Sequence, residues 1–380
     1  MSNRAGDFIM QPSGFKSFLP HDLPPEPPIE FDGEMLALLS EADRKLGRLD
    51  GVTQILPNPE LFVAMYVKKE AVLSSQIEGT QASLTDVLEI NIKDEKREDV
   101  GEVVNYVSAM NYGLDRLKEF PLCLRLIREI HEKLLNNGRG SNRNPGEFRK
   151  TQNWIGPAGC TLATARFVPP IVPDMEKALE NLENFFYAED NIPALIKIAL
   201  IHSQFESIHP FLDGNGRMGR LLITFWLCHR GILSQPLLYL SYYFKKNRLE
   251  YYDRLMAVRE KGDWEGWIKF FLKGVAITAD EATSTAKEII QLKSACENKI
   301  VSNNYSAMYN VLLENIFMYP IITINDAVQL LKVSYPTAAK IIENFCRLDI
   351  LLDATPDQKR NKRYAFSTYM EILNRGTELL

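Results

Sequence analysis

The segment HPFLDGNGRMGR, at residues 209–220, constrains this chain more than any other part of the sequence. Apolar residues recur at helical spacing on both sides of it, from Leu195 to Ile208 and again from Met218 to Phe225. The segment is therefore predicted to be a short loop that opens a helix. Backbone N–H groups at the start of a helix, together with the helix dipole, favour a bound anion at such a loop.

The residue types within this loop suit phosphate groups. Gly214 and Gly216 permit the positive φ angles that turn successive backbone amides into an anion-binding nest. Arg217 and Arg220 add positive charge, and the carboxylate of Asp213 is a ligand for a divalent cation held against the same phosphates. The loop is predicted to bind the phosphates of a nucleotide.

His209 opens the loop, and the ordinary pKa of an imidazole, about 6.5, suits a general base near neutral pH. Each part of the loop also has a plainer interpretation. Asp-Gly-Asn-Gly is commonly a turn, His before Pro is commonly a helix end, and two arginines three positions apart are commonly a solvated helix face. All parts converge on one loop, which favours a nucleotide site with a base beside it.

The pattern His-Pro-Phe-x-Asp-Gly-Asn-Gly-Arg-x-x-Arg resembles the signature of the Fic family of protein AMP-transferases at every fixed position. The resemblance implies that His209 deprotonates a Ser, Thr or Tyr hydroxyl of a target protein, which then attacks the α-phosphate of ATP. It implies that Asp213 holds Mg²⁺ on the α- and β-phosphates and that Arg220 pairs with the γ-phosphate. The ATP-binding residues that it implies are Glu78, His209, Phe211, Asp213, Gly214, Asn215, Gly216, Arg217 and Arg220. A related branch that phosphorylates its targets has a bulkier residue in place of Gly216, so glycine favours AMP transfer.

A second motif, SSQIEG, closes a helix predicted over about residues 60–79. Gly79 suits the position just after a helix, and Ser74 and Glu78 share one helix face. Read alone, the motif is a solvated helix end, where a glutamate is mildly unfavourable. It resembles the inhibitory helix of one class of Fic proteins, in which Ser74, Glu78 and Gly79 would be the inhibitory residues. By that resemblance Glu78 pairs with Arg220, withholds it from the γ-phosphate and forces ATP into an unproductive pose.

Residues 149–170 interrupt the run of helical patterns. Two short segments, 152–157 and 165–168, flank a turn-forming region, which favours a β-hairpin. The resemblance identifies this hairpin as the flap, on which an extended segment of the target protein docks. An ordinary surface hairpin is the alternative interpretation. Protein substrates on the flap are therefore the expected partners, and a homodimer is left open.

The last eighty residues are predicted to form a separate small domain. Helical patterns at 323–331 and 335–347 are followed by two candidate strands around the basic turn 359–363, an order that resembles a winged helix-turn-helix. Residues 301–380 hold eight Lys/Arg and eight Asp/Glu, whereas nucleic-acid modules are usually basic. Both DNA binding and protein docking by this domain are left open.

The expected fold is mainly α: a Fic helical bundle with a β-hairpin flap and a C-terminal winged helix-turn-helix domain. Five prolines between Pro20 and Pro28 exclude regular helix from the N-terminal arm. The aromatic residues of 239–244 are interpreted as core in preference to an adenine pocket. The predicted parts are the arm 1–35, the catalytic domain 36–275, a linker helix 276–300 and the winged-helix-like domain 301–380.

Composition is consistent with a cytoplasmic enzyme. The five cysteines have no paired or metal-like spacing, the start of the chain lacks the apolar segment of a secretory signal, and no apolar run approaches the ~18 residues that span a bilayer. No membrane partner is expected. The predicted function is a self-inhibited, magnesium-dependent protein adenylyltransferase that may modify itself as well. Removal of AMP by the same site and a nucleotide-sensing DNA-binding regulator are the alternatives.

Overall fold

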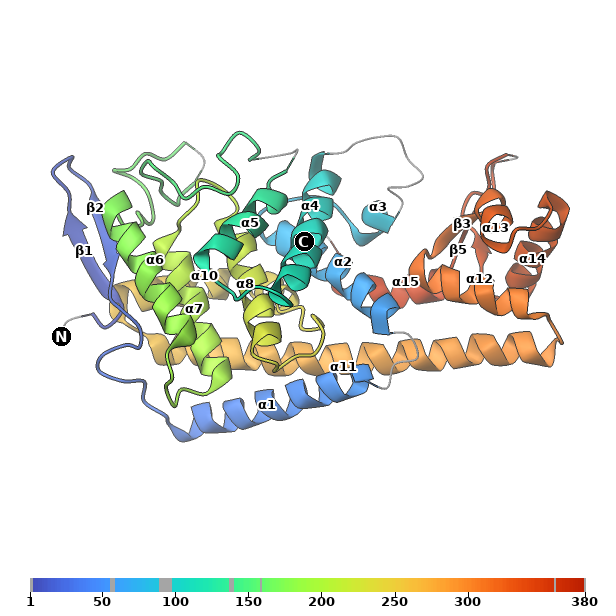
Figure 1. Cartoon of the computed structure of the whole chain (residues 1–380), viewed down its shortest axis with the longest axis horizontal. Coiled ribbons are helices and arrows are strands. Elements are labelled where there is room, and N and C mark those ends of the chain that lie inside the picture. The colour runs from blue at the N-terminus through green and yellow to red at the C-terminus, as the bar shows by residue number, and fades with distance from the viewer. Residues whose placement is uncertain are drawn as a thin grey trace.

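Figure 1 shows the computed structural model of the chain, which describes residues 3–54, 59–88, 98–136, 140–157, 159–358 and 360–378. Helices dominate it, so the prediction of a mainly α fold is confirmed. The elements are β1 (Gly6–Met10), β2 (Lys16–Pro20), α1 (Gly33–Gln54), α2 (Pro59–Ile77), α3 (Leu84–Leu88), α4 (Glu98–Leu117), α5 (Leu124–Leu134), α6 (Val172–Tyr187), α7 (Ala194–Ile208), α8 (Asn215–His229), α9 (Ser241–Lys246), α10 (Arg248–Lys261), α11 (Trp264–Ser302), α12 (Ala307–Met318), β3 (Ile321–Thr323), α13 (Ile324–Leu331), α14 (Tyr335–Arg347), β4 (Leu352–Asp353), β5 (Arg363–Ala365) and α15 (Ser367–Asn374).

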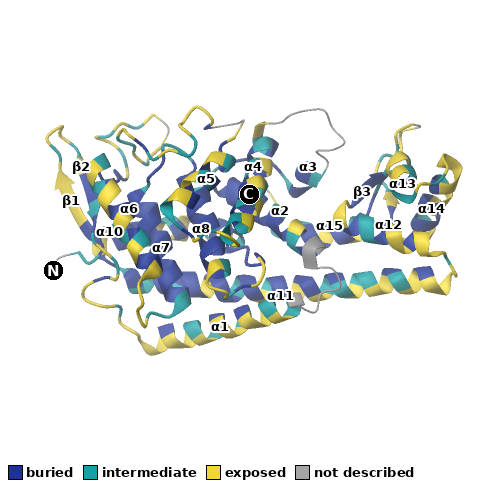
Figure 2. Cartoon of the chain, viewed as in Figure 1, coloured by how far each residue is buried: buried dark blue, intermediate teal, exposed yellow. Residues whose placement is uncertain are grey.

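The longest element is α11, a helix of 39 residues that runs under the whole molecule, with α1 packed along it (Figure 1). The sequence suggested an apolar helix at 264–275 and a separate polar linker helix at 276–300. They are one helix, because no proline interrupts it. Figure 2 shows that α11 is buried under the bundle and keeps only a buried stripe beyond it. The change in composition marks where the helix leaves the bundle and not where a helix ends.

The centre of the bundle is α7, in which every residue from Leu195 to Ile208 is buried. A helix that is covered on all sides shows no solvated face, and the polar residues of α7, such as His202 and Glu206, are buried along with its apolar ones. The helix packs against α6, α8, α10 and α11. The loop after α7 therefore starts from a fully buried helix.

The N-terminal arm contains a β-hairpin that the sequence analysis did not predict. Strands β1 and β2 pair antiparallel, with Gly6 opposite Pro20, and the N–H of Phe18 donates to the carbonyl of Val168 at 2.9 Å. The rings of Phe18 and Phe167 lie 5.7 Å apart. The arm is thus packed beside the segment in which the flap was expected.

That flap segment, residues 149–170, has less regular structure than the predicted hairpin. A single antiparallel bridge joins Ile155 and Phe167, with N–H to carbonyl distances of 2.8 and 3.1 Å. The next hydrogen-bonded pairs of such a ladder would involve Pro157 and Pro169, which have no N–H to donate. The prediction of two paired strands here is wrong for this reason, although the chain does fold back at the predicted place.

The C-terminal unit, residues 307–374, follows the predicted succession of elements. Helices α13 and α14 lie within a residue of the predicted ranges, and the sheet has the order β3-β5-β4, all antiparallel. Thr323 and Asp326 form a capping box at the start of α13. The added helix α15 leads the chain back to α2 and α11 (Figure 1). No helix among the described residues combines the length and apolar character that a membrane span needs.

Candidate active site

The loop predicted to bind phosphates lies between α7 and α8. His209 ends α7 in the left-handed region, with φ 49°, and Gly214 precedes α8 with φ 76°. The side chain of Asn215 ties the loop to itself: its Oδ1 accepts from the N–H of Phe211 and its Nδ2 donates to the carbonyl of Phe211, both at 2.8 Å. The loop therefore has a fixed shape and opens a helix, as the sequence predicted.

His131, on α5, contacts this loop, and the sequence analysis did not identify it. Its Nε2 donates to the carbonyl of Asp213 and its Nδ1 accepts from the N–H of Gly146, both at 2.9 Å. Its ring stacks on that of Phe211, with centroids 3.6 Å apart. Burial lowers the pKa of His131 to about 4, in agreement with a neutral ring that accepts at Nδ1. The ring of Phe211, predicted to contact ATP, is fully buried under the loop.

Two residues at the start of the flap segment hold the backbone of His209. Arg149 donates from Nε to the carbonyl of His209 at 3.1 Å and from its N–H to the carbonyl of Pro210 at 2.9 Å. Asn153 donates from Nδ2 to the same His209 carbonyl and to that of Phe211. The side chain of Arg149 is buried, and burial lowers its pKa to about 10. The start of the flap segment is thus hydrogen-bonded to the backbone of the loop between α7 and α8.

The imidazole of His209 is neutral at physiological pH. Burial lowers its pKa to about 3, and the nearby guanidiniums of Arg259 and Arg149 add to the effect. Its Nδ1 is buried and has no hydrogen-bond partner in the part of the chain that the structure describes. A neutral imidazole can take up a proton, which is what the predicted general base must do.

Helix α2 brings Ser74 and Glu78 to Arg220, as predicted. The guanidinium donates from Nε to Ser74 Oγ at 2.8 Å, from Nη2 to the Ser74 carbonyl at 3.0 Å, and from Nη2 to Glu78 Oε1 at 2.7 Å. Gly79 has φ +97°, so it ends the helix in the conformation expected of it. Burial alone would raise the pKa of Glu78, but Arg220 outweighs that effect and the pKa lies below its ordinary value. The pair is a charged contact between α2 and α8.

The carboxylate of Glu78 lies directly over Gly216. A Cβ placed on Gly216 would be 2.3 Å from Glu78 Oε1 and 3.1 Å from Arg220 Nη1. This space faces the first turn of α8, where free N–H groups and the helix dipole favour negative charge. The Glu78 carboxylate therefore lies beside the first turn of α8, where the sequence analysis expects phosphate.

Asp213 and Arg217 form the other side of the loop. Arg217 lies 3.6 Å from Asp213 Oδ1 and 3.5 Å from Glu102 Oε2, and Thr80 Oγ1 donates to the same Glu102 oxygen at 2.8 Å. Glu102, on α4, was not identified from the sequence. Asp213 keeps 32% of its side chain exposed, and the described residues contain no group of three His, Cys, Asp or Glu that could hold a metal. A single carboxylate fits Mg²⁺ only when phosphate oxygens complete the coordination, as is usual for this ion.

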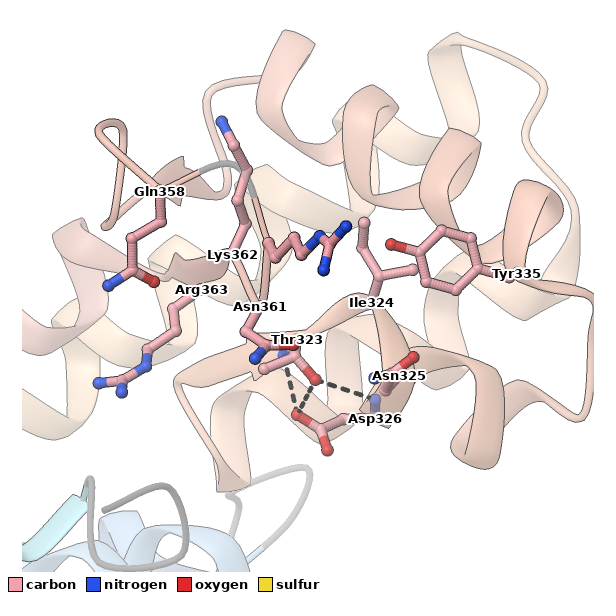
Figure 3. Close-up of a pocket in the computed structure, with 10 residues that line it drawn as sticks. Thr323, Ile324, Asn325, Asp326, Tyr335, Gln358, Asn361, Lys362 and Arg363 are labelled. Carbon is pink, nitrogen blue, oxygen red and sulfur yellow. Dashed lines mark hydrogen bonds between the residues drawn. The ribbon is translucent and has the colours of Figure 1, made fainter.

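A second polar cavity, of about 680 Å³, lies in the C-terminal unit (Figure 3). Its one carboxylate, that of Asp326, is engaged by the N–H and hydroxyl of Thr323 at 2.8 and 2.7 Å. Its basic side chains come from the turn between β4 and β5. The cavity is lined by Thr323, Ile324, Asn325, Asp326, Tyr335, Gln358, Arg360, Asn361, Lys362 and Arg363.

The fold and the loop define a helical protein in which Glu78 pairs with Arg220 beside the first turn of α8. The profile described as Fic/DOC family N-terminal matches residues 36–115, and that of the Fic/DOC family matches residues 121–227. The chain therefore belongs to the Fic/DOC family.

Curated relatives match this chain over about half of its length. A protein adenylyltransferase Fic from Drosophila grimshawi is 29% identical over 226 residues, which cover 56% of this chain and 43% of the relative. A probable protein adenylyltransferase from Aquifex aeolicus is 31% identical over 210 residues, or 53% of this chain and 58% of the relative. The chain thus spans about half the length of the curated relatives it matches. The structure of a Fic family protein from Desulfovibrio desulfuricans G20 has the same fold, with a TM-score of 0.58 at 20% identity over 89% of this chain and 97% of that one.

Proposed function

We propose that this chain transfers AMP from ATP to Ser, Thr or Tyr hydroxyls of proteins, and that Glu78 holds the enzyme off. The observation that carries the proposal is the contact of Glu78 with Arg220 over the start of α8, beside a neutral His209. His209, the proposed base, lies beside the proposed phosphate site, and the carboxylate of Glu78 fills that site in place of phosphate. The relatives named protein adenylyltransferase support the reaction type.

The proposed reaction follows from the roles of the loop residues. His209 takes the proton of the target hydroxyl, whose oxygen forms a bond to the α-phosphorus while the bond to the β-phosphate oxygen breaks. Pyrophosphate leaves, and AMP stays on the protein. Backbone N–H groups from Gly214 to Gly216 and the guanidinium of Arg217 would hold the phosphates. Asp213 is the residue that would hold Mg²⁺, which supplies charge neutralisation between the α- and β-phosphates.

Inhibition is an exchange of anions at Arg220. The side chain of Arg220 is only 2% exposed, so its guanidinium needs a negative partner. With Glu78 in place that partner is the carboxylate, and an ATP γ-phosphate would meet both an occupied guanidinium and a like charge. When Glu78 leaves, the γ-phosphate can take its place without leaving a buried charge unpaired.

The test is to compare the parent chain with Glu78→Gly, using ATP labelled on either the α- or the γ-phosphate. We expect Glu78→Gly to incorporate α-label into protein at a much higher rate than the parent, and neither chain to incorporate γ-label. The variant with Arg220→Ala added should lose the gain, because the γ-phosphate then has no partner. Absence of α-label in every variant would contradict adenylylation, and incorporation of γ-label would indicate phosphorylation.

Removal of AMP from modified proteins is the alternative reaction of the same site. It is favoured by the 35% exposure of the Glu78 side chain, which leaves the carboxylate able to contact water. In that case Glu78→Gly should abolish release of AMP from an adenylylated protein while it increases transfer. Equal release by the parent and the variant would argue against this role of Glu78.

Binding of duplex DNA by the C-terminal unit is a second candidate function. The cavity of Figure 3 is lined by Arg360, Lys362 and Arg363 and also by Tyr335, the first residue of α14. In a winged helix-turn-helix this second helix is the one that enters the DNA groove. We expect a labelled duplex to bind with a strong salt dependence and Arg360→Ala to weaken it. Equal binding by Arg360→Ala, or none by the parent, would leave protein docking as the role of this unit.

A further inference from the structure

The chain returns to the inhibitory helix after α15, at residues 375–378. The carbonyl of Thr377 accepts from Gln76 Nε2 on α2 at 3.1 Å, and the carbonyl of Glu378 accepts from Lys245 Nζ on α9. Thr377 is only 4% exposed, although it lies near the end of the sequence. Three residues contact this segment and are together called the seat: Gln76, Tyr242 and Lys245.

The segment fits the seat closely. Gly376 has φ +80°, and a Cβ at this position would lie 2.4 Å from Cε2 and 2.7 Å from Cδ2 of Tyr242. The segment also holds its own shape, since the N–H of Gly376 donates to Glu378 Oε1 and the hydroxyl of Thr377 to the carbonyl of Asn374. Chain ends without such contacts are usually poorly ordered. Only glycine can occupy position 376 in this arrangement.

The seat adjoins the residue that inhibits the enzyme. Gln76 belongs to the last turn of α2, two positions before Glu78, and its Nε2 also donates to the carbonyl of Ala82 at 3.0 Å. One side-chain amide therefore joins the 375–378 segment to both ends of the turn that carries Glu78. Gln76 is buried, so loss of either acceptor would leave a buried donor less satisfied.

The C-terminal unit makes further contacts with α2. Helices α12 and α15 both pack on it, and Lys68 Nζ lies 6.0 Å from the centre of the Tyr319 ring. Arg375 forms an ion pair of 2.7 Å with Glu288 of α11. The inhibitory helix is thus held between the catalytic bundle on one side and the C-terminal unit on the other.

We propose that the seat is an interaction surface whose occupant, residues 375–378 of this chain, keeps Glu78 on Arg220. Withdrawal of the segment frees Gln76, loosens the turn from Ile77 to Ala82 and lets phosphate displace the carboxylate. A partner that binds the C-terminal unit would then activate the enzyme without touching the active site. This coupling rests on the proposed function, since it regulates the same site.

The test uses Gly376→Val in the full chain, with Gly14→Val as its control. Valine disfavours the positive φ at both positions, but Gly14 has no atom within 4 Å of its Cβ direction and lies in the arm hairpin. We expect Gly376→Val to raise α-label transfer on the order of tenfold, the shift that loss of one or two net hydrogen bonds produces. It should also speed amide exchange at residues 78–80, and Gly14→Val should change neither. An unchanged rate together with unchanged exchange would overturn the proposal.

A second comparison separates this proposal from the proposed function. In the Glu78→Gly background there is no carboxylate for residues 375–378 to keep on Arg220, so adding Gly376→Val should give no further gain in transfer. If Glu78→Gly itself transfers no AMP, adenylylation fails, whereas faster exchange at 78–80 in Gly376→Val still supports the coupling. Should Gly376→Val not fold, Lys245→Met replaces it, with the exposed Lys261→Met as control. A gain in transfer that persists fully in the Glu78→Gly background would overturn the proposal.

Discussion

At the scale of single residues, the site is organised around the buried charge of Arg220, which Glu78 neutralises. Two further buried carboxyls, Glu70 and Glu206, lie near it, and burial raises the pKa of each to about 7. Glu78 differs from them because it touches the guanidinium directly and its pKa is lowered. It is therefore the carboxylate that remains charged at neutral pH, and the one that competes with a phosphate.

The role of His209 leads to a prediction at this scale. In the Glu78→Gly background, His209→Ala should lower the rate of AMP transfer by roughly 10²–10⁴-fold, the usual contribution of a general base. ATP affinity should change little, because the amides that face the phosphates come from Gly214 to Gly216. Transfer of α-label and calorimetric titration with ATP measure the two effects, and the exposed His229→Ala serves as control. A large loss of ATP affinity would show that His209 binds the nucleotide rather than acting as a base.

At the scale of elements, the spacing of apolar residues predicted the helices. The residue types of the segment 209–220 predicted the loop that opens α8. The sequence also placed Glu78 near Arg220, because both motifs matched a known pattern. It did not show His131 or Glu102, whose roles depend on contacts across the bundle. His131 could have been noticed as a polar residue on the apolar face of its helix, beside Ile130 and Leu134. The β1–β2 hairpin was missed because only its second strand is buried, so the pair shows no clear alternation.

The flap segment gives a prediction of its own. The guanidinium of Arg149 donates hydrogen bonds to the carbonyls of His209 and Pro170. Arg149→Met removes these bonds, so the loop should keep its fold while the backbone of His209 shifts. A misplacement of about 1 Å can cost on the order of 10²-fold in rate. We expect the rate constant of AMP transfer to fall by about that factor and the KM for ATP to stay nearly unchanged. The control is Arg166→Met, an exposed arginine of the same segment that pairs with Asp253. Equal effects of the two variants would assign the loss to charge and not to positioning.

At the scale of the whole molecule, residues 375–378 lie beside the last turn of α2. Gln76 and Thr377 are separated by 301 positions, and no local pattern signals their contact. The long helix α11 makes the contact possible, because it carries the chain beyond the bundle and α12–α15 bring it back (Figure 1). Sequence analysis identified helices and two candidate strands of the C-terminal unit, but not β3, α15 or the return to α2. That return depends on long-range packing, which no local pattern signals.

Buried titratable groups also make the stability of the molecule depend on pH. Burial lowers the pKa of His131 to about 4 and of His202 and His209 to about 3, from an ordinary value of about 6.5. As pH falls below 6.5 the unfolded chain protonates these three groups before the native protein does, which reduces stability. The raised pKa of Glu70 and Glu206 has the opposite effect: between pH 7 and about 4.5 the native protein binds those protons first, so stability gains as pH falls.

These opposing effects predict the shape of the acid stability curve. Between pH 6.5 and 4.5 two glutamates offset two of the three histidines, so one histidine is left uncompensated and the free energy of unfolding should fall by about 1.4 kcal/mol per pH unit. Below about pH 4.5 the glutamates are protonated in both states, the histidines act alone, and stability should fall steeply. Denaturant titrations at pH 7, 6, 5 and 4 measure the curve. In Glu206→Gln one offset is removed, so its stability should decline about twice as steeply as that of the parent between pH 6.5 and 4.5. A parent curve as steep above pH 4.5 as below it would mean that the two glutamates do not hold protons in the native bundle.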